Sequence, residues 1–133
     1  MGTAAAQTFG DFIREKREAL GKTIRGFAAE IKIGNSYLND IEKGNRNPPE
    51  KYLEAIANGL GITEEKELNT FYDLAGKFRN GSFSDLNGYI AKKDVARVAL
   101  RTARDHNIPD RQWQKFIDEI KDGSKVTKKQ DGD

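Results

Sequence analysis

Residues 23–49 constrain the fold more than any other stretch, because they combine two short amphipathic patterns with a break between them. In the first pattern, apolar side chains recur at the i, i+3, i+4 and i+7 positions of a helix, namely Ile24, Phe27, Ala28 and Ile31. Thr23 is a good N-cap for that helix. The break falls at residues 32–34, and a second short helix is predicted over residues 35–43. Each helix is expected to bury one face and expose the other.

Three more helices are predicted around this pair. The first is capped by Thr8, and the fourth covers residues 50–58 after a double proline. Thr63 is expected to cap the fifth helix, in which apolar side chains repeat at helical spacing: Leu68, Phe71, Tyr72 and Ala75. No alternating strand pattern occurs in the sequence, so the predicted fold class is all-α.

Three motifs in this region resemble those of the Cro/cI-type (XRE family) helix-turn-helix DNA-binding domain. They are Phe27-Ala28, Ser36-Tyr37-Leu38 and the closing run Ile41-Glu42-Lys43-Gly44-Asn45-Arg46-Asn47-Pro48, of which the closing run is the most specific. The resemblance extends from about Phe9 to about Phe78, roughly half of the chain. It implies a five-helix, lambda-repressor-like DNA-binding domain, here followed by a C-terminal helical extension.

The helix over residues 35–43 is the predicted reading element. Side chains near the N-terminus of such a helix, and one turn further on, face the major groove. In this sequence they are Asn35, Ser36, Tyr37, Asn39 and Asp40. Asn can pair with adenine, Ser can contact several base edges or a phosphate, and Asp can accept a hydrogen bond from cytosine. The alternative is that Asn35 and Ser36 only cap the helix and that Asp40 is solvated.

The resemblance also implies roles outside the reading positions. Five residues match positions where the family grips phosphates: Thr23, Arg25, Lys43, Arg46 and Asn47. Arg17 and Glu42 match a partly buried ion pair that is often seen in the family. Lys32 replaces a usual Gly, so a left-handed backbone there would cost about 1 kcal/mol or more. Gly34 replaces a common Ser or Thr cap, which weakens the cap by only about a few tenths of a kcal/mol.

Residues 80–121 are predicted to form two or three further helices behind a turn-rich boundary. The helix from Asp94 to about His106 has apolar residues nearly all round, so it must be covered on more than one side. We expect a homodimer formed through Val95, Val98, Ala99, Trp113, Phe116, Ile117 and Ile120. The alternative is that these helices fold back on residues 1–79 and enlarge its core. Residues 122–133 have almost no apolar content and are predicted to be a disordered tail.

Composition argues against several function classes. The 133 residues include no cysteine, and 23 Lys and Arg nearly balance 21 Asp and Glu. No apolar run is long enough to cross a bilayer and the start shows no signal-peptide pattern, so a cytoplasmic protein without a membrane partner is expected. His106 is the only histidine, and neither a catalytic triad nor a metal site has recognisable members. We therefore predict no enzyme activity, no catalytic residue, no metal and no cofactor.

The resemblance implies a sequence-specific transcriptional regulator that binds double-stranded DNA, and we predict a dimeric repressor. One alternative is an antitoxin or mobile-element regulator whose C-terminal helices bind a protein partner. Another is an adaptor protein that has lost DNA binding. The acidic side chain of Asp40 and the zero net charge of residues 1–79 are consistent with this alternative. Salt-sensitive DNA binding would exclude the adaptor.

Overall fold

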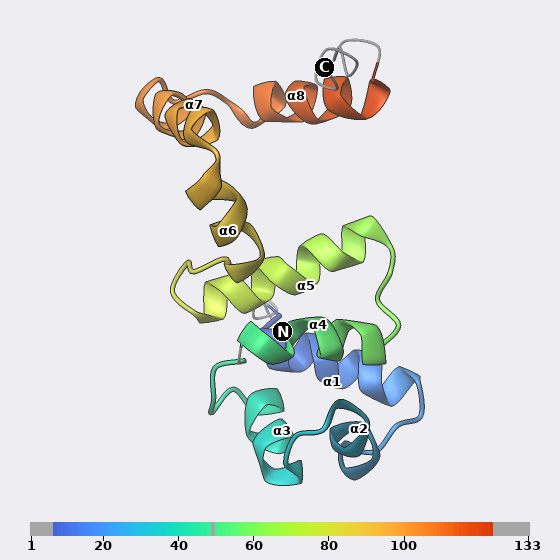
Figure 1. Ribbon diagram of the computed structural model, residues 1–133. Helices are drawn as coiled ribbons and strands as arrows, with labels where there is room; N and C mark the ends of the chain where they lie inside the picture. The colour runs from blue at the N-terminus through green and yellow to red at the C-terminus, as the bar shows by residue number, and fades with distance from the viewer. Residues whose placement is uncertain (1–6, 49, 124–133) are drawn as a thin grey trace, which may run out of the picture. The chain divides into compact units, whose positions relative to one another are not determined.

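The structure is a computed structural model that describes residues 7–48 and 50–123. These residues form eight helices and no strand, which confirms the predicted all-α class (Figure 1). The helices are α1 (Phe9–Ala19), α2 (Ile24–Ile31), α3 (Asn35–Glu42), α4 (Glu50–Gly59), α5 (Glu65–Phe78), α6 (Ser84–Lys92), α7 (Asp94–Asp105) and α8 (Asp110–Asp122). The chain divides into two compact units between Gly88 and Tyr89, within α6.

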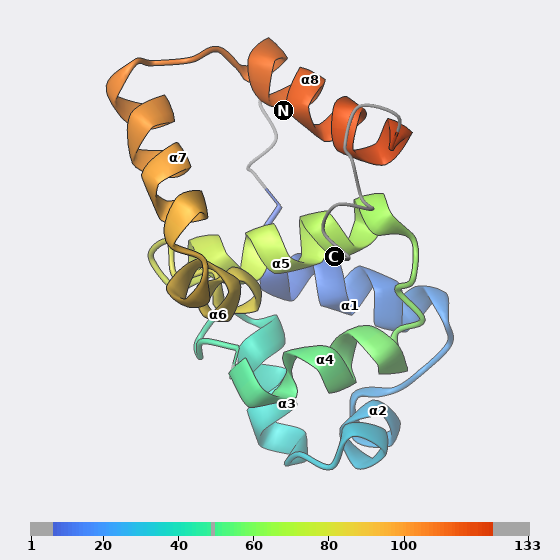
Figure 2. The ribbon, with the colours of Figure 1, turned by 45° about the horizontal axis from the view of Figure 1, so that its top comes forward.

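The first unit packs α1–α5 around one apolar core. α3 lies against α1 and α2, α2 against α4, and α1 against α5. Both ribbon views show α2 and α3 side by side at one end of this unit (Figure 1 and Figure 2). The buried apolar side chains are Phe9, Phe12, Ile13, Phe27, Ala28, Ile31, Leu38, Ile41, Leu53, Ile56, Ala57, Leu60, Ile62, Phe71 and Ala75. Each of the larger ones stabilises the unit by about 1.5–3 kcal/mol relative to an exposed position.

Gly10 allows α1 to lie directly against the end of α3. A Cβ atom built on Gly10 would lie 2.2 Å from the backbone oxygen of Glu42, far inside van der Waals contact. The last turn of α3 therefore rests on the backbone of α1, and only glycine leaves room for that approach.

The predicted helix starts are confirmed at Thr8 and Thr23 but not at Thr63. The Thr8 hydroxyl oxygen accepts a hydrogen bond from the Asp11 N–H at 3.0 Å, and the Asp11 carboxylate accepts one from the Thr8 N–H at 3.3 Å. α5 begins later than predicted, with Glu64 as an N-cap that makes no side-chain capping bond. Ile62 is buried and its N–H donates to the Ala57 oxygen at 3.0 Å, so Ile62 still belongs to the turn that follows α4. α5 begins only after this turn.

The turn after α5 stays attached to the first unit. Gly81 adopts a φ of 88°, as the turn-rich sequence suggests. The Phe83 ring then packs closely against Gly76 of α5, where a Cβ atom would lie 2.1 Å from the ring. The division of the structure at Gly88 therefore lies beyond the predicted boundary at residues 79–80.

In the second unit no residue of α7 or α8 is fully buried. Arg97 of α7 donates to the backbone oxygens of Ile90 and Ala91, at 2.6 and 2.7 Å, and so satisfies carbonyl groups in the last turn of α6. A shallow groove of about 400 Å³ is lined by Ala99, Thr102, Ala103, Ile108, Gln112, Trp113 and Phe116. Asp122, assigned to a disordered tail by its composition, ends α8. The rest of that predicted tail, from residue 124, lies outside the described residues.

Candidate nucleic-acid interface

α2 and the turn after it place α3 at the surface of the first unit. The Thr23 hydroxyl oxygen accepts a hydrogen bond from the Gly26 N–H at 2.9 Å and so caps α2. α2 ends at Ile31, and its C-cap Lys32 has a left-handed backbone with a φ of 59° and a ψ of 46°. The expected strain of about 1–2 kcal/mol for a side-chain-bearing residue is therefore present at this turn. Lys32 keeps this conformation while its N–H bonds to the Ala28 and Ala29 oxygens.

α3 is fixed by one face and open on the other. Leu38 and Ile41 are completely buried, whereas Asn35 and Ser36 are exposed. Gly34 is the N-cap and makes no side-chain capping bond, so the first N–H groups of α3 have no side-chain acceptor from this residue. Among the described residues, the side chains of Asn35 and Ser36 have no hydrogen-bond partner. The capping alternative considered for Asn35 and Ser36 is therefore wrong, because neither side chain makes the capping bond.

The structure brings three of the predicted contact residues together. The Arg46 guanidinium carbon lies 4.8 Å from the centre of the Tyr37 ring, and Arg46 Nε lies 3.8 Å from Asp40 Oδ2. Gly44 makes this contact possible, because its φ of 81° reverses the chain at the end of α3. The Asn45 N–H donates to the backbone carbonyl oxygen of Asp40 at 2.9 Å and closes the turn. Arg46 therefore lies on the same face as two predicted reading residues.

The other residues predicted to contact phosphates lie at the start of α2 and just after α3. Thr23, Arg25, Lys43 and Asn47 are all exposed. α3 ends at Glu42, so Lys43, predicted as its last residue, is instead its C-cap. Within the part of the chain that the structure describes, the side chains of Arg25 and Lys43 form no hydrogen bond or ion pair. Both cations are therefore available to an anionic ligand, and their phosphate contacts stay a prediction.

Arg17 and Glu42 form a buried, two-pronged ion pair between α1 and α3. Arg17 Nε and Nη2 donate to Glu42 Oε2 and Oε1 at 2.7 and 2.9 Å, and Arg17 Nη1 donates to the Lys22 oxygen at 2.8 Å. Only 8% and 3% of the two side chains are exposed. The hydrogen bonds to Glu42 raise the pKa of Arg17 above its already high ordinary value. The pair fixes the C-terminal end of α3 to α1.

Two basic residues that the sequence analysis did not select, Lys22 and Arg79, form hydrogen bonds between distant segments of the first unit. Lys22 Nζ donates to the Gly59 oxygen at 2.9 Å and to Glu30 Oε1 at 2.8 Å. Arg79 Nη1 donates to the Pro48 oxygen at 3.0 Å, in the loop that follows the contact residues. These contacts join positions 37 and 31 residues apart. No local spacing could have indicated them.

Comparison with known proteins identifies this arrangement. A family model described as helix-turn-helix matches residues 13–66. The HTH-type transcriptional regulator YazB of Bacillus subtilis is 36% identical over 61 residues, which are 46% of this chain and 88% of that protein. The chain belongs to the XRE-type helix-turn-helix family. The family resemblance inferred from the sequence is thereby confirmed.

Two other helix-turn-helix relatives match a smaller share of their own length. The transcriptional regulator ClgR of Mycobacterium tuberculosis is 30% identical over 62 residues, 47% of this chain and 55% of that protein. The control protein C.MunI of a Mycoplasma species is 38% identical over 56 residues, 41% of this chain and 76% of that protein. The chain thus spans about half the length of ClgR. No solved structure matches the chain.

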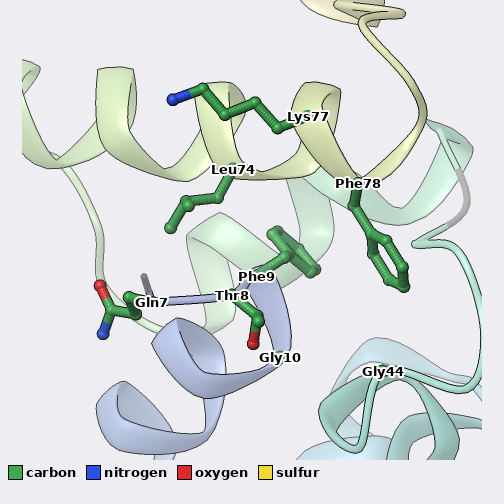
Figure 3. Close-up of a pocket in the computed structure, with 8 residues that line it drawn as sticks. All are labelled: Gln7, Thr8, Phe9, Gly10, Gly44, Leu74, Lys77 and Phe78. Carbon is green, nitrogen blue, oxygen red and sulfur yellow. The ribbon is translucent and has the colours of Figure 1, made fainter. Parts of the chain in front are cut away.

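The helix-turn-helix unit also contains an apolar groove of about 370 Å³. It is lined by Gln7, Thr8, Phe9, Gly10, Gly44, Leu74, Lys77 and Phe78. Figure 3 shows Leu74 pointing from α5 toward α1 and Phe78 pointing toward the loop at Gly44, while the Lys77 side chain runs along α5. The groove therefore offers mainly apolar contact, with Lys77 as the one charged residue of its lining.

Within residues 7–48 and 50–123, no group of three or more His, Cys, Asp and Glu side chains could hold a metal ion. No helix of that part of the chain has both the length and the apolar character needed to span a bilayer.

Proposed function

We propose that this chain is a sequence-specific, DNA-binding transcriptional repressor that inserts α3 into the major groove and binds its operator as a homodimer. The proposal rests on which side chains of α3 are buried and which are exposed. Its inner face is completely buried at Leu38 and Ile41, while Asn35 and Ser36 at its start are exposed and without partners among the described residues. A rigid helix with free polar side chains near its N-terminus is what base reading requires.

The cations around α3 support the same orientation. Thr23 and Arg25 lie at the start of α2, and Lys43 lies just after α3. Exposed side chains on both sides of a groove-reading helix can contact the two phosphate backbones. The reading residues then supply the sequence preference and the flanking residues supply salt-dependent affinity.

DNA binding is tested by fluorescence anisotropy of the full chain on duplexes selected from a randomised library, across a salt series. We expect the selected duplex to bind at least about a hundredfold tighter than scrambled DNA, with affinity falling steeply as salt rises. An Asn35→Ala/Ser36→Ala double variant should lose that preference. A Thr70→Ala variant, at an exposed position on α5, serves as the matched control and should keep it. If the wild-type chain selects no sequence at any salt concentration, the proposal is wrong.

For the dimer we propose the apolar face of α7 and α8. Large apolar side chains on these helices are exposed within their unit: Val95, Val98, Leu100, Phe116, Ile117 and Ile120. Ala99 is also exposed, and Trp113 is half-buried with its ring edge-on to Phe116 at 6.2 Å. This much apolar surface on two short helices is typical of an interface. A second copy of the same face would cover it and pair two reading heads.

The assembly is tested by sedimentation velocity over a range of concentrations. We expect a dimer that Phe116→Asp converts to a monomer, because the charge would be buried in the apolar interface. Lys115→Asp, on an exposed polar position of the same helix, should leave the dimer intact. A wild-type chain that stays monomeric at all concentrations would contradict the dimer. It would favour the alternative, a different protein partner on the same face, as in an antitoxin or mobile-element regulator.

A further inference from the structure

Arg46 contacts both Tyr37 and Asp40 on the reading face, and a phosphate-binding role for Arg46 does not explain these contacts. Tyr37 and Asp40 are one turn apart on α3, so their side chains share a face. Arg46 comes from the loop after α3 and reaches back over both, 4.8 Å from the ring centre of Tyr37 and 3.8 Å from Asp40 Oδ2. Tyr37 is itself partly buried against the core. The guanidinium thus has a fixed platform beneath it.

The charge of this cluster makes it a poor phosphate contact. Asp40 and Arg46 together carry no net charge, and the Asp40 carboxylate repels any phosphate that approaches Arg46. Phosphate contacts gain most of their free energy from neutralising charge and releasing counterions. A neutral pair gains little of it. Arg25 and Lys43, which have no acidic partner among the described residues, are better placed for that role.

The same geometry suits a base edge. Asp40 Oδ2 lies 3.8 Å from Nε, and the two terminal nitrogens of Arg46 form no hydrogen bond in the described part of the chain. These two donors form a planar fork, and the cation–π contact with Tyr37 keeps the guanidinium beside the ring. Guanine presents two acceptors, N7 and O6, to the major groove, whereas adenine presents one acceptor and one donor. Guanine is therefore the base that the fork fits.

We propose that Arg46 is a specificity-determining residue that reads a guanine in the major groove, with Tyr37 and Asp40 as the positioning residues that hold its guanidinium. This inference rests on the proposed function, and it reassigns Arg46 from the phosphates to the bases. Side-chain exposures of 58% for Arg46 and 42% for Asp40 leave the cluster accessible to DNA.

The test compares Arg46→Ala with Lys43→Ala, an exposed cation beside the same helix, using the full chain and the duplex selected by the wild type. Each base pair of that duplex is changed in turn, and affinities are measured by fluorescence anisotropy at several salt concentrations. For the wild type we expect one guanine in each half-site whose replacement weakens binding about tenfold to a hundredfold. Arg46→Ala should abolish discrimination at that base pair and keep it elsewhere. Lys43→Ala should weaken all duplexes alike and reduce the salt slope by about one.

Asp40→Asn provides a second measurement that a phosphate contact would not predict. Removing the acid leaves Arg46 with an uncompensated charge, so binding to scrambled DNA should strengthen and its salt slope should steepen by about one. Discrimination at the guanine should fall, because the guanidinium is no longer held.

The outcomes separate this inference from the proposed function. A wild type that selects no sequence defeats both. A wild type that selects a sequence, with Arg46→Ala flattening the salt slope and leaving every base preference intact, defeats only the inference and returns Arg46 to the phosphates. Circular dichroism of each variant shows whether the exposed substitutions leave the fold unchanged.

Discussion

The buried pair of Arg17 and Glu42 makes a quantitative prediction about the stability of the helix-turn-helix unit. Glu42→Ala removes both acceptors of the Arg17 fork and leaves a guanidinium that is only 8% exposed. Breaking a buried ion pair from one side costs about 3–5 kcal/mol, because the remaining charge is left without compensation in a poorly solvated site. The Lys22 oxygen, 2.8 Å from Nη1, satisfies only one of the three hydrogen-bonding nitrogens.

A loss of this size is easily measured. For a domain of about 60–100 residues each kcal/mol shifts the melting temperature by about 4–8 °C, so the unit should melt at least about 12 °C lower. Urea unfolding followed by circular dichroism gives the free energy of unfolding directly. Trp113, the only tryptophan, lies in α8, so its fluorescence follows the second unit separately.

Two controls make the test decisive. Glu18 lies 3.9 Å from Arg17 Nη2 but is 61% exposed, so Glu18→Ala should cost only about 0–1 kcal/mol. The double variant Arg17→Met/Glu42→Leu removes both charges and should recover most of the stability lost in Glu42→Ala. If Glu42→Ala costs no more than Glu18→Ala, or if the double variant is as unstable as the single one, the reasoning from burial is wrong.

Further predictions concern the turn before α3 and the start of α1. Lys32→Gly should raise the free energy of unfolding by about 1 kcal/mol, since glycine adopts the left-handed backbone without strain; urea unfolding measures this, and a decrease would contradict it. Hydrogen bonds from the Thr8 backbone N–H, then its hydroxyl, and the nearby Arg14 hold the pKa of Asp11 below its ordinary value of 3.8. Its stabilising effect should therefore be complete above that value and be lost as pH falls through the lowered pKa. Acid unfolding of Asp11→Asn should lack this component, and an identical acid profile would refute it.

Much of the fold could be predicted because it depends on local patterns. The periodic apolar residues of α2 and the caps at Thr8 and Thr23 are properties of a few consecutive residues, and the structure has them where they were expected. Thr63 shows the limit of such reasoning. Its capping preference is overridden because Ile62 is held in the core by the connection from α4.

The candidate site was predictable only as a set of positions. Helical geometry placed Tyr37 and Asp40 on one face, but the location of Arg46 depends on how the chain reverses at Gly44. The bond from Arg79 to the Pro48 oxygen depends on packing between distant segments. The contacts of Arg46 and Arg79 both involve residues outside α3. They depend on tertiary structure, so the helical pattern of α3 could not predict them.

Some residues of α3 are buried in the core and others are exposed for the proposed DNA recognition, which explains why stability and recognition can change independently. Leu38, Ile41 and Glu42 anchor the helix through buried contacts, so substitutions there cost stability and disturb the reading face only indirectly. Asn35 and Ser36 are exposed and without partners among the described residues, so their substitution should cost little stability. Arg46 contributes to both, because it is exposed for recognition and also contacts Tyr37 and Asp40 on the surface of α3. Variation at Asn35, Ser36 and Arg46 could therefore alter the recognised sequence while the buried face of α3 keeps the fold.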